Sequence, residues 1–168
     1  MEASKVQVVD NFLWAHDFLL IKAALLDPEF EWHFNDKVID GPVLDAKNVT
    51  YQFVKVFYTN NSVISPRIDL LAPLMAKLPI RSLIRIKANF NPASNKQVAS
   101  GFHTDFDFPE STTAVFYLNT NNGYTLFENG EKVESVENRL VLFPSTSRHS
   151  GVECTDAPYR LLLNINFF

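Results

Sequence analysis

Hydrophobic and polar positions alternate most clearly in the second half of the chain. From Ser82 to Asn89, the polar residues Arg85, Lys87 and Asn89 alternate with apolar neighbours, which is typical of a strand with one buried face. Short segments rich in β-branched and aromatic residues follow, separated by turn residues such as Asn121-Asn122-Gly123. This pattern predicts further strands over Val98–Thr104, Thr112–Leu118, Tyr124–Phe127, Arg139–Phe143, Arg148–Cys154 and Tyr159–Phe168.

The first half of the chain has a more helical pattern. Apolar residues recur at helical spacing from Phe12 to Leu26, with Asp10 or Asn11 as the expected cap and Asp27-Pro28 as the end. The pattern also predicts strands over Lys5–Val9 and Phe30–Phe34 and a helix over Pro66–Lys77 that Pro73 would interrupt. The pattern of the segment Val49–Tyr58 does not distinguish a helix from a strand.

Strands spaced by about 8–12 residues, with turn residues between them, favour a β-sandwich or barrel. We therefore expect a mainly β fold: a jelly roll, or double-stranded β-helix, supported by N-terminal helices on one face. No linker or repeat divides the chain, so residues 1–168 are predicted to form a single domain. Residues 1–80 would provide helical support, and residues 81–168 would form the jelly-roll core.

Composition narrows the class of protein. The chain has 168 residues, 46% hydrophobic and 20% charged, as expected for one globular domain. The net charge of −4 without a basic cluster argues against a nucleic-acid partner. The single cysteine, Cys154, excludes an internal disulfide and a cysteine-rich metal site. No stretch reaches the ~20 apolar residues of a membrane span, and no signal peptide is evident, so we expect a cytoplasmic protein with no membrane partner.

The histidines suggest a metal site. His103 and Asp105 are two residues apart at the end of a predicted strand, where such side chains point to the same side. Asp107 shares the same alternation, so the choice of carboxylate stays open. His149 follows an apolar strand that could lie opposite His103 in a sandwich. Two histidines and one carboxylate form the facial set of non-haem Fe(II) oxygenases.

A basic residue in an apolar strand gives a second signal. Arg160 lies within Tyr159-Arg160-Leu161-Leu162-Leu163, where a buried charge is costly without an anionic partner. Its planar guanidinium group suits a carboxylate. That carboxylate could belong to an internal aspartate or glutamate, or to a bound co-substrate.

Taken in their order along the chain, several of these segments resemble the iron- and 2-oxoglutarate-dependent oxygenases of the prolyl 4-hydroxylase-like group. The resemblance covers roughly residues 82 to 168. It is carried by Gly101-Phe102-His103-Thr104-Asp105, Thr113–Asn119, Gly123–Phe127, Asn138–Pro144, His149-Ser150-Gly151-Val152 and Pro158-Tyr159-Arg160-Leu161. The chain departs from the family pattern at Asn122-Gly123, where two glycines are usual, at Thr125, where an acidic residue is common, and at Tyr159.

The resemblance implies a set of site residues. His103, Asp105 and His149 match the catalytic iron ligands, and Arg160 matches the residue that pairs with the far carboxylate of 2-oxoglutarate. Tyr117 matches the tyrosine that hydrogen-bonds the same carboxylate, although it could equally be a core aromatic. On the predicted strand entering the core, Arg85 and Asn89 share one face and are further candidates for co-substrate binding. The implied cofactors are Fe(II), 2-oxoglutarate and O2, with ascorbate as an optional addition.

The implied activity is a dioxygenase that hydroxylates a C–H bond and releases succinate and CO2. A peptidyl proline is the first expected substrate, with other protein side chains or small molecules as further options. The loops at 35–48, 58–66 and 91–100 would recognise it. Two alternatives remain: a jelly-roll binding or structural module without catalysis, and a cupin-like metalloenzyme that uses no 2-oxoglutarate. The first would not need all four of His103, Asp105, His149 and Arg160, and the second would leave Arg160 without a role.

Overall fold

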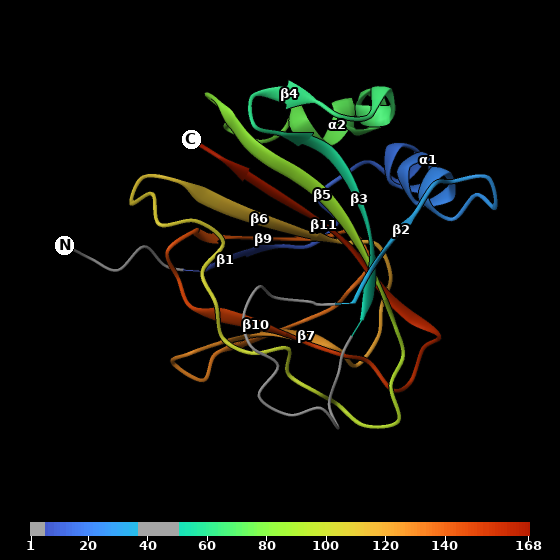
Figure 1. Ribbon diagram of the computed structural model, residues 1–168, viewed down its shortest axis with the longest axis vertical. Coiled ribbons are helices and arrows are strands. Elements are labelled where there is room, and N and C mark those ends of the chain that lie inside the picture. The colour runs from blue at the N-terminus through green and yellow to red at the C-terminus, as the bar shows by residue number, and fades with distance from the viewer. Residues whose placement is uncertain (1–5, 37–50) are drawn as a thin grey trace.

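Two antiparallel sheets lie across from each other in the computed structural model, which describes residues 6–36 and 51–168 (Figure 1). The larger sheet has the strand order β1-β9-β6-β11-β5-β3-β2, with β4 paired to β3; the smaller one has the order β10-β7-β8. The larger sheet contains β1 (Gln7–Val9), β2 (His33–Asn35), β3 (Gln52–Thr59), β4 (Ser62–Val63), β5 (Leu83–Pro92), β6 (Thr112–Tyr117), β9 (Arg139–Pro144) and β11 (Tyr159–Phe167). The smaller sheet contains β7 (Tyr124–Phe127), β8 (Lys132–Glu134) and β10 (His149–Val152). The mainly β architecture is confirmed and is consistent with a jelly roll.

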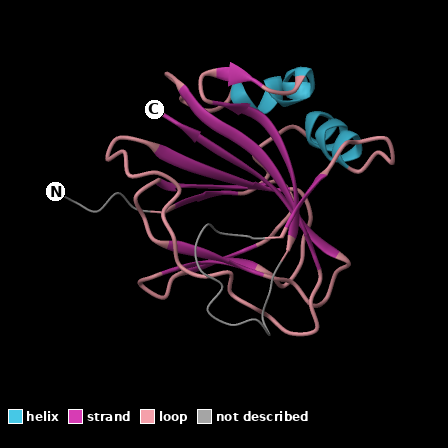
Figure 2. Cartoon of the chain, in the orientation of Figure 1, coloured by secondary structure: helices cyan, strands magenta, loops and turns pink. Residues whose placement is uncertain are grey.

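Helical segments pack on the outer face of the larger sheet (Figure 2). They are α1 (Ala15–Leu25), the 3-10 helix η2 (Pro66–Leu71) and α2 (Ala72–Met75). Phe18, Ile21 and Leu25 of α1 belong to the same buried cluster as Ile86 of β5 and Phe116 of β6. Burial of these apolar side chains removes a large hydrophobic area from water and is the main force that holds the layers together.

The two central strands of the larger sheet separate core from site. Side chains alternate across a strand, so Leu161, Leu163 and Ile165 of β11 point into the helix-covered core. Arg160, Leu162, Asn164 and Asn166 therefore share the opposite face. In the register of β11 with β5 they lie opposite Asn91, Asn89, Lys87 and Arg85, respectively. This double row, polar except for Leu162, faces the smaller sheet and provides one wall of the site.

Several predicted elements differ from the observed ones. The first helix begins at Ala15 rather than Phe12, because the backbone N–H groups of Phe12 and Leu13 donate to Asn138 and hold this stretch extended. Neither Asp10 nor Asn11 caps it; Trp14 occupies the cap position. The expected helix over Pro66–Lys77 is a 3-10 turn followed by a short α-helix. The ambiguous segment before residue 59 is the strand β3, and β8 was not predicted.

The predicted strand Val98–Thr104 is wrong. This stretch makes only the isolated bridges Ala99–Val152 and His103–His149. Gly101 between them has a φ of 103°, a left-handed conformation that interrupts an extended strand and that glycine adopts without steric cost. Most of the expected substrate loop at 35–48 lies outside the described residues. No helix in the described ranges is long and apolar enough to cross a membrane.

Candidate functional site

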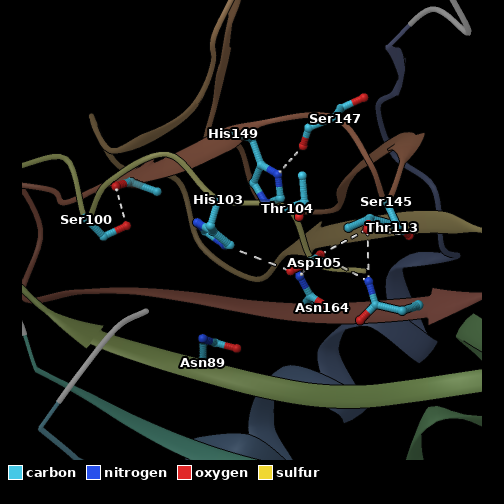
Figure 3. Close-up of polar contacts among 12 residues, drawn as sticks. Asn89, Ser100, His103, Thr104, Asp105, Thr113, Ser145, Ser147, His149 and Asn164 are labelled. Atoms are coloured by element: carbon cyan, nitrogen blue, oxygen red, sulfur yellow. Dashed lines mark hydrogen bonds and ion pairs between the residues drawn. The ribbon is translucent and has the colours of Figure 1, made fainter. Parts of the chain in front are cut away.

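Two histidines and one aspartate meet beside β10 (Figure 3). His103 and His149 exchange backbone hydrogen bonds with N···O distances of 3.0 and 2.9 Å, which fix the loop before β6 against β10. Their imidazole centroids lie 4.6 Å apart. One potential ligand atom from each of His103, Asp105 and His149 lies within 4.8 Å of the others. The structure thus brings together the three residues proposed from the sequence.

Both imidazoles present the same nitrogen to the shared space. Nδ1 of His103 lies 3.2 Å from the carbonyl oxygen of Gly101, and Nδ1 of His149 lies 2.9 Å from that of Ser147. A carbonyl oxygen only accepts, so Nδ1 carries the proton and the Nε2 lone pair is left for a metal. Burial, and then repulsion from His149, lower the pKa of His103, which favours the neutral form that binds metals.

Asp105 is held by an unusually complete set of donors. Its Oδ2 accepts from Thr113 Oγ1 at 2.9 Å and from the amide nitrogens of Asn164 and Asn166, each at 3.0 Å. Its Oδ1 lies 3.2 Å from Nη2 of Arg85 and 3.9 Å from Nε2 of His103. Three donors therefore orient the carboxylate through Oδ2, and Oδ1 faces the histidines.

These contacts decide the charge of Asp105. Burial alone would raise its pKa, but the electrostatic interactions with His149 and Arg85 and the amide hydrogen bonds from Asn164 and Asn166 outweigh burial, and the pKa lies well below its usual range. The group is a carboxylate at neutral pH. Asp107, the alternative considered from the sequence, is exposed and accepts a hydrogen bond from Thr104. It is not part of the cluster of potential ligands.

Replacing Asn166 with alanine tests the support of Asp105. Asn166 is fully buried, donates to both Asp105 and Thr113, and accepts from Nε of Arg85. We expect the Asn166→Ala variant to lose about 1–3 kcal/mol of unfolding free energy because buried partners are left unsatisfied, and to bind metal about 10-fold more weakly. Urea denaturation and a metal titration measure the two effects. Asn95→Ala, at an exposed position, is the control; equal behaviour of the two variants would contradict this role.

A buried arginine lies in the same cavity. Arg160 is only 4% exposed, and its Nε donates to Oγ of Ser135 at 2.8 Å while Nη2 lies 3.3 Å from Oγ1 of Thr125. Its guanidinium group also lies over the ring of Tyr117, 5.4 Å from the centroid. No described carboxylate oxygen lies within 4.0 Å of the Arg160 guanidinium group. The ion pairs among the described residues all involve other basic side chains. The charge is therefore positioned by neutral groups and left for an anion.

The cavity between the two sheets joins these features. Its volume is about 80 Å³, and its walls include the three potential metal ligands and Arg160. The other lining residues come from β3, β5, β6, β7, β10, β11, the loop before β6 and the residue that follows β10: Gln52, Lys87, Asn89, Asn91, Ser100, Val115, Thr125, Gly151, Val152, Glu153, Leu162 and Asn164. A metal and a small anion would thus occupy one continuous space.

The remaining candidates from the sequence fall into different places. Asn89 lines the cavity. Arg85 pairs with Asp105 and lies over the ring of Phe106 instead of lining the cavity. Tyr117 is fully buried behind the cavity, and its hydroxyl lies 2.7 Å from Oγ1 of Thr125. Tyr117 therefore contacts the Arg160 environment through its ring and through Thr125.

Sequence reasoning missed the small residues around Arg160. Ser135 and Thr125 orient the guanidinium group. Ser135 carries no signal in the sequence, and Thr125 stands out only as a departure from the family pattern, without an indication of its role. Gly123 belongs to the same motif. A Cβ at this glycine would lie 2.8 Å from Cδ of Arg160 and 2.8 Å from the backbone oxygen of Val152, so only glycine leaves room for the arginine.

Glu153 adds a buried acidic group to the cavity wall. Burial raises its pKa, while a hydrogen bond from Ser94 and the charge of Arg160 oppose this. A raised pKa means that the folded protein holds the proton to higher pH than the unfolded chain, so stability falls as the pH rises through this window. We expect Glu153→Gln to stabilise the protein more at about pH 8 than at about pH 4, measured by urea unfolding. Exposed Glu131→Gln is the control, and a stability gain of Glu153→Gln that is independent of pH would contradict this reading.

Comparison with known proteins begins with two negative results: no protein-family model and no curated protein matches this chain. Solved structures do match. A Pseudomonas putida prolyl-4-hydroxylase superposes with a TM-score of 0.64 at 19% identity, covering 96% of this chain and 91% of its own. An oxidoreductase of the 2OG-Fe(II) oxygenase family from Burkholderia pseudomallei reaches a TM-score of 0.72 at 12% identity, with coverages of 96% and 84%.

The chain has the fold of the 2OG-Fe(II) oxygenases. A third neighbour is a Trichoplax adhaerens prolyl hydroxylase in complex with a peptide fragment of the hypoxia inducible factor oxygen degradation domain (TM-score 0.64, 14% identity, coverages 96% and 83%). The oxygenase fold therefore extends over nearly the whole described chain, including the N-terminal half for which the sequence carried no resemblance. At these identities the likeness establishes the fold, and function must be argued from the site.

Proposed function

We propose that this protein is an Fe(II)- and 2-oxoglutarate-dependent dioxygenase that hydroxylates a C–H bond of a peptide or protein, with a prolyl residue as the first candidate. The observation that carries the proposal is the pairing of two features in one cavity. Three potential metal ligands line it together with a buried Arg160 that forms no ion pair with a described carboxylate. A metal site alone would not require this arginine, and a structural ion pair would supply its own acid.

The residues fit the implied metal. His103, His149 and Asp105 supply two neutral nitrogens and one carboxylate oxygen, and the described residues add no fourth ligand to the cluster. A 2-His-1-carboxylate set with open positions suits non-haem Fe(II). When bound, Fe(II) would supply the oxidation of the C–H bond by O2, coupled to conversion of 2-oxoglutarate into succinate and CO2. We assign to the protein the tasks of holding the ligands, orienting the co-substrate and excluding water.

Each task has residues in the structure. Asn164, Asn166 and Thr113 hold Asp105, so the carboxylate does not reorient as charge changes at the metal. Arg160 would bind the far carboxylate of 2-oxoglutarate. Because Thr125 and Ser135 already position its guanidinium group, little side-chain freedom would be lost on binding.

The size of the site and one structural neighbour support the proposed substrate class. The cavity of about 80 Å³ is small beside the ~300–1,000 Å³ of drug-sized ligand pockets. A small co-substrate would fill it, and a larger substrate would present one residue at its mouth. The Trichoplax prolyl hydroxylase is in complex with a peptide fragment, which supports a peptide or protein substrate here.

Incubation with Fe(II), 2-oxoglutarate and O2 tests the reaction directly. We expect slow succinate formation that requires all three components and that rises when a proline-containing peptide is added; mass spectrometry should then show a gain of one oxygen on the peptide. Metal binding without 2-oxoglutarate binding would contradict the proposal and indicate a cupin-like metalloprotein. Failure to bind metal would indicate a jelly-roll module without catalysis.

A further inference from the structure

Glu153 places an acidic side chain beside the proposed anion-binding end of the cavity. Side chains alternate along an extended chain, so Glu153 shares the face of His149 and Gly151. That face is turned toward Arg160, because a Cβ at Gly151 would lie 3.5 Å from Nη1 of the arginine. Glu153 lies two residues further on, lines the same cavity and is only 8% exposed. The cavity therefore holds a cation and an acid at the same end.

Glu153 and Arg160 interact without forming an ion pair. The ion pairs among the described residues, with N···O distances up to 4.0 Å, do not include this couple. Burial raises the pKa of Glu153, and a hydrogen bond from Ser94 and the charge of Arg160 oppose this effect. Arg160 is thus one of the groups that favour the charged form of Glu153 while no co-substrate is bound.

An anion bound to Arg160 would change this balance. The far carboxylate of 2-oxoglutarate would offset the guanidinium charge that favours the charged form of Glu153. It would also bring a second negative charge into the same cavity. Both effects favour the protonated form of Glu153, because a nearby like charge and the loss of an opposite charge each disfavour ionisation. Binding of the anion should therefore be accompanied by uptake of a proton.

The other titratable groups near Glu153 have different tasks. Cys154, the next residue, stays a neutral thiol because burial and Asp156 raise its pKa. The remaining titratable side chains that line the cavity belong to β5, the loop before β6 and β10: Lys87, His103, Asp105 and His149. Lys87 lies opposite Asn164 in the sheet, at the metal end. The other three would hold the metal, which requires neutral histidines and an ionised aspartate.

We infer that Glu153 takes up a proton when 2-oxoglutarate binds at Arg160, and that the site thereby couples its affinity for the co-substrate to pH. This inference rests on the proposed function and adds a regulatory group to the same site. A ligand that binds together with a proton binds more weakly as the pH rises. The affinity should fall by up to about tenfold per pH unit while Glu153 ionises in the free protein, and level off once it is ionised in the complex as well.

Calorimetry on the metal-loaded protein tests the inference. Protein loaded with Fe(II) without O2 is titrated with 2-oxoglutarate at several pH values between about 6 and 8. Each titration is repeated in two buffers of different ionisation enthalpy, and the difference in heat gives the number of protons taken up. We expect the wild-type protein to take up as much as about one proton per 2-oxoglutarate, and to bind it more weakly as the pH rises.

The Glu153→Gln variant replaces the acid with a neutral side chain of nearly the same shape. It should take up no proton, and its affinity for 2-oxoglutarate should not change with pH. At about pH 8, where the wild-type acid is most ionised, the variant should bind 2-oxoglutarate severalfold more tightly than the wild-type protein. The control is exposed Glu131→Gln, which should keep both the proton uptake and the pH dependence of the wild-type protein.

A second ligand tests the wild-type protein without any variant. 2-Oxopentanoate keeps the metal-chelating end of 2-oxoglutarate and has a methyl group in place of the far carboxylate. It leaves the charge of Arg160 uncompensated, so it should bind more weakly and without proton uptake at Glu153. This comparison keeps the inference testable even if Glu153→Gln does not fold.

The outcomes separate the inference from the proposed function. Binding of 2-oxoglutarate without proton uptake would overturn the inference and leave the proposed function standing. Equal uptake by the wild-type protein and Glu153→Gln, or equal uptake with the two ligands, would do the same, because the proton would then bind elsewhere. Failure of the Fe(II)-loaded wild-type protein to bind 2-oxoglutarate would defeat the proposed function and the inference together.

Discussion

Replacing His149 with alanine is expected to abolish the visible charge-transfer absorption that Fe(II) and 2-oxoglutarate produce together in the absence of O2. His149 supplies one of three potential ligands, and its ring is fixed by Ser147 and by the bridge to His103. Loss of an outer partner of a metal ligand commonly weakens metal binding 10–100-fold, so loss of the ligand itself should exceed about 100-fold. An anaerobic Fe(II) titration in the presence of 2-oxoglutarate measures both the charge-transfer absorption and the affinity for Fe(II).

The matched control for this experiment is His33→Ala. His33 lies in the edge strand β2, is exposed, and does not line the cavity. The His33→Ala substitution also removes an imidazole group, but at a position away from the cavity. It should therefore leave the charge-transfer absorption and the affinity for Fe(II) unchanged. If His149→Ala keeps the absorption, or if both variants lose it equally, the three-residue cluster is not the metal site. A melting temperature for each variant separates loss of metal from loss of fold.

Much of the β core could be predicted from the sequence because its strands alternate cleanly. Segments such as Tyr124–Phe127 agree with the observed strand from end to end. In this strand one face is buried and the other is partly exposed, and this difference imposes a period of two on the sequence. Strands β6 and β9 contribute to buried clusters on both faces, and their continuous apolar and β-branched residues predicted them instead. The ends of α1 and the course of Val98–Thr104 could not be predicted, because distant partners decide them. Asn138 holds the chain before α1, and a single glycine conformation breaks the second segment.

The candidate site divides in the same way. His103, Asp105, His149 and Arg160 stand out in the sequence because their chemistry is unusual for their surroundings. The groups that make them usable do not stand out. Asn164 and Asn166 alternate with apolar residues in β11 and hold Asp105, but an asparagine in a strand carries no signal until its partner is known. Arg85 shows that sharing a strand face with a site residue does not show that a side chain lines the cavity. It lies on the expected side of β5 but supports Asp105 instead of lining the cavity.

Arg160 gives a second prediction in which binding and stability change in opposite directions. Substitution by methionine should weaken 2-oxoglutarate binding about 100-fold or more, because truncating one partner of a buried charge pair costs that much. Iron binding should persist, since no metal ligand changes. The same variant should be at least as stable as the wild-type protein without ligand, because replacing a buried charge that forms no ion pair with a described carboxylate by an apolar side chain removes a desolvation cost.

The opposite signs distinguish a ligand-binding arginine from a structural one. If Arg160 stabilised the fold through an internal ion pair, Arg160→Met would lower the free energy of unfolding along with the affinity. The control is Arg148→Met, which removes an exposed arginine paired with Glu128 at 2.9 Å and should change neither quantity appreciably. Equilibrium unfolding in urea without ligand and calorimetry with 2-oxoglutarate give the two measurements. A stable Arg160→Met protein with intact iron binding and lost 2-oxoglutarate binding would show that the fold keeps this buried charge for its co-substrate.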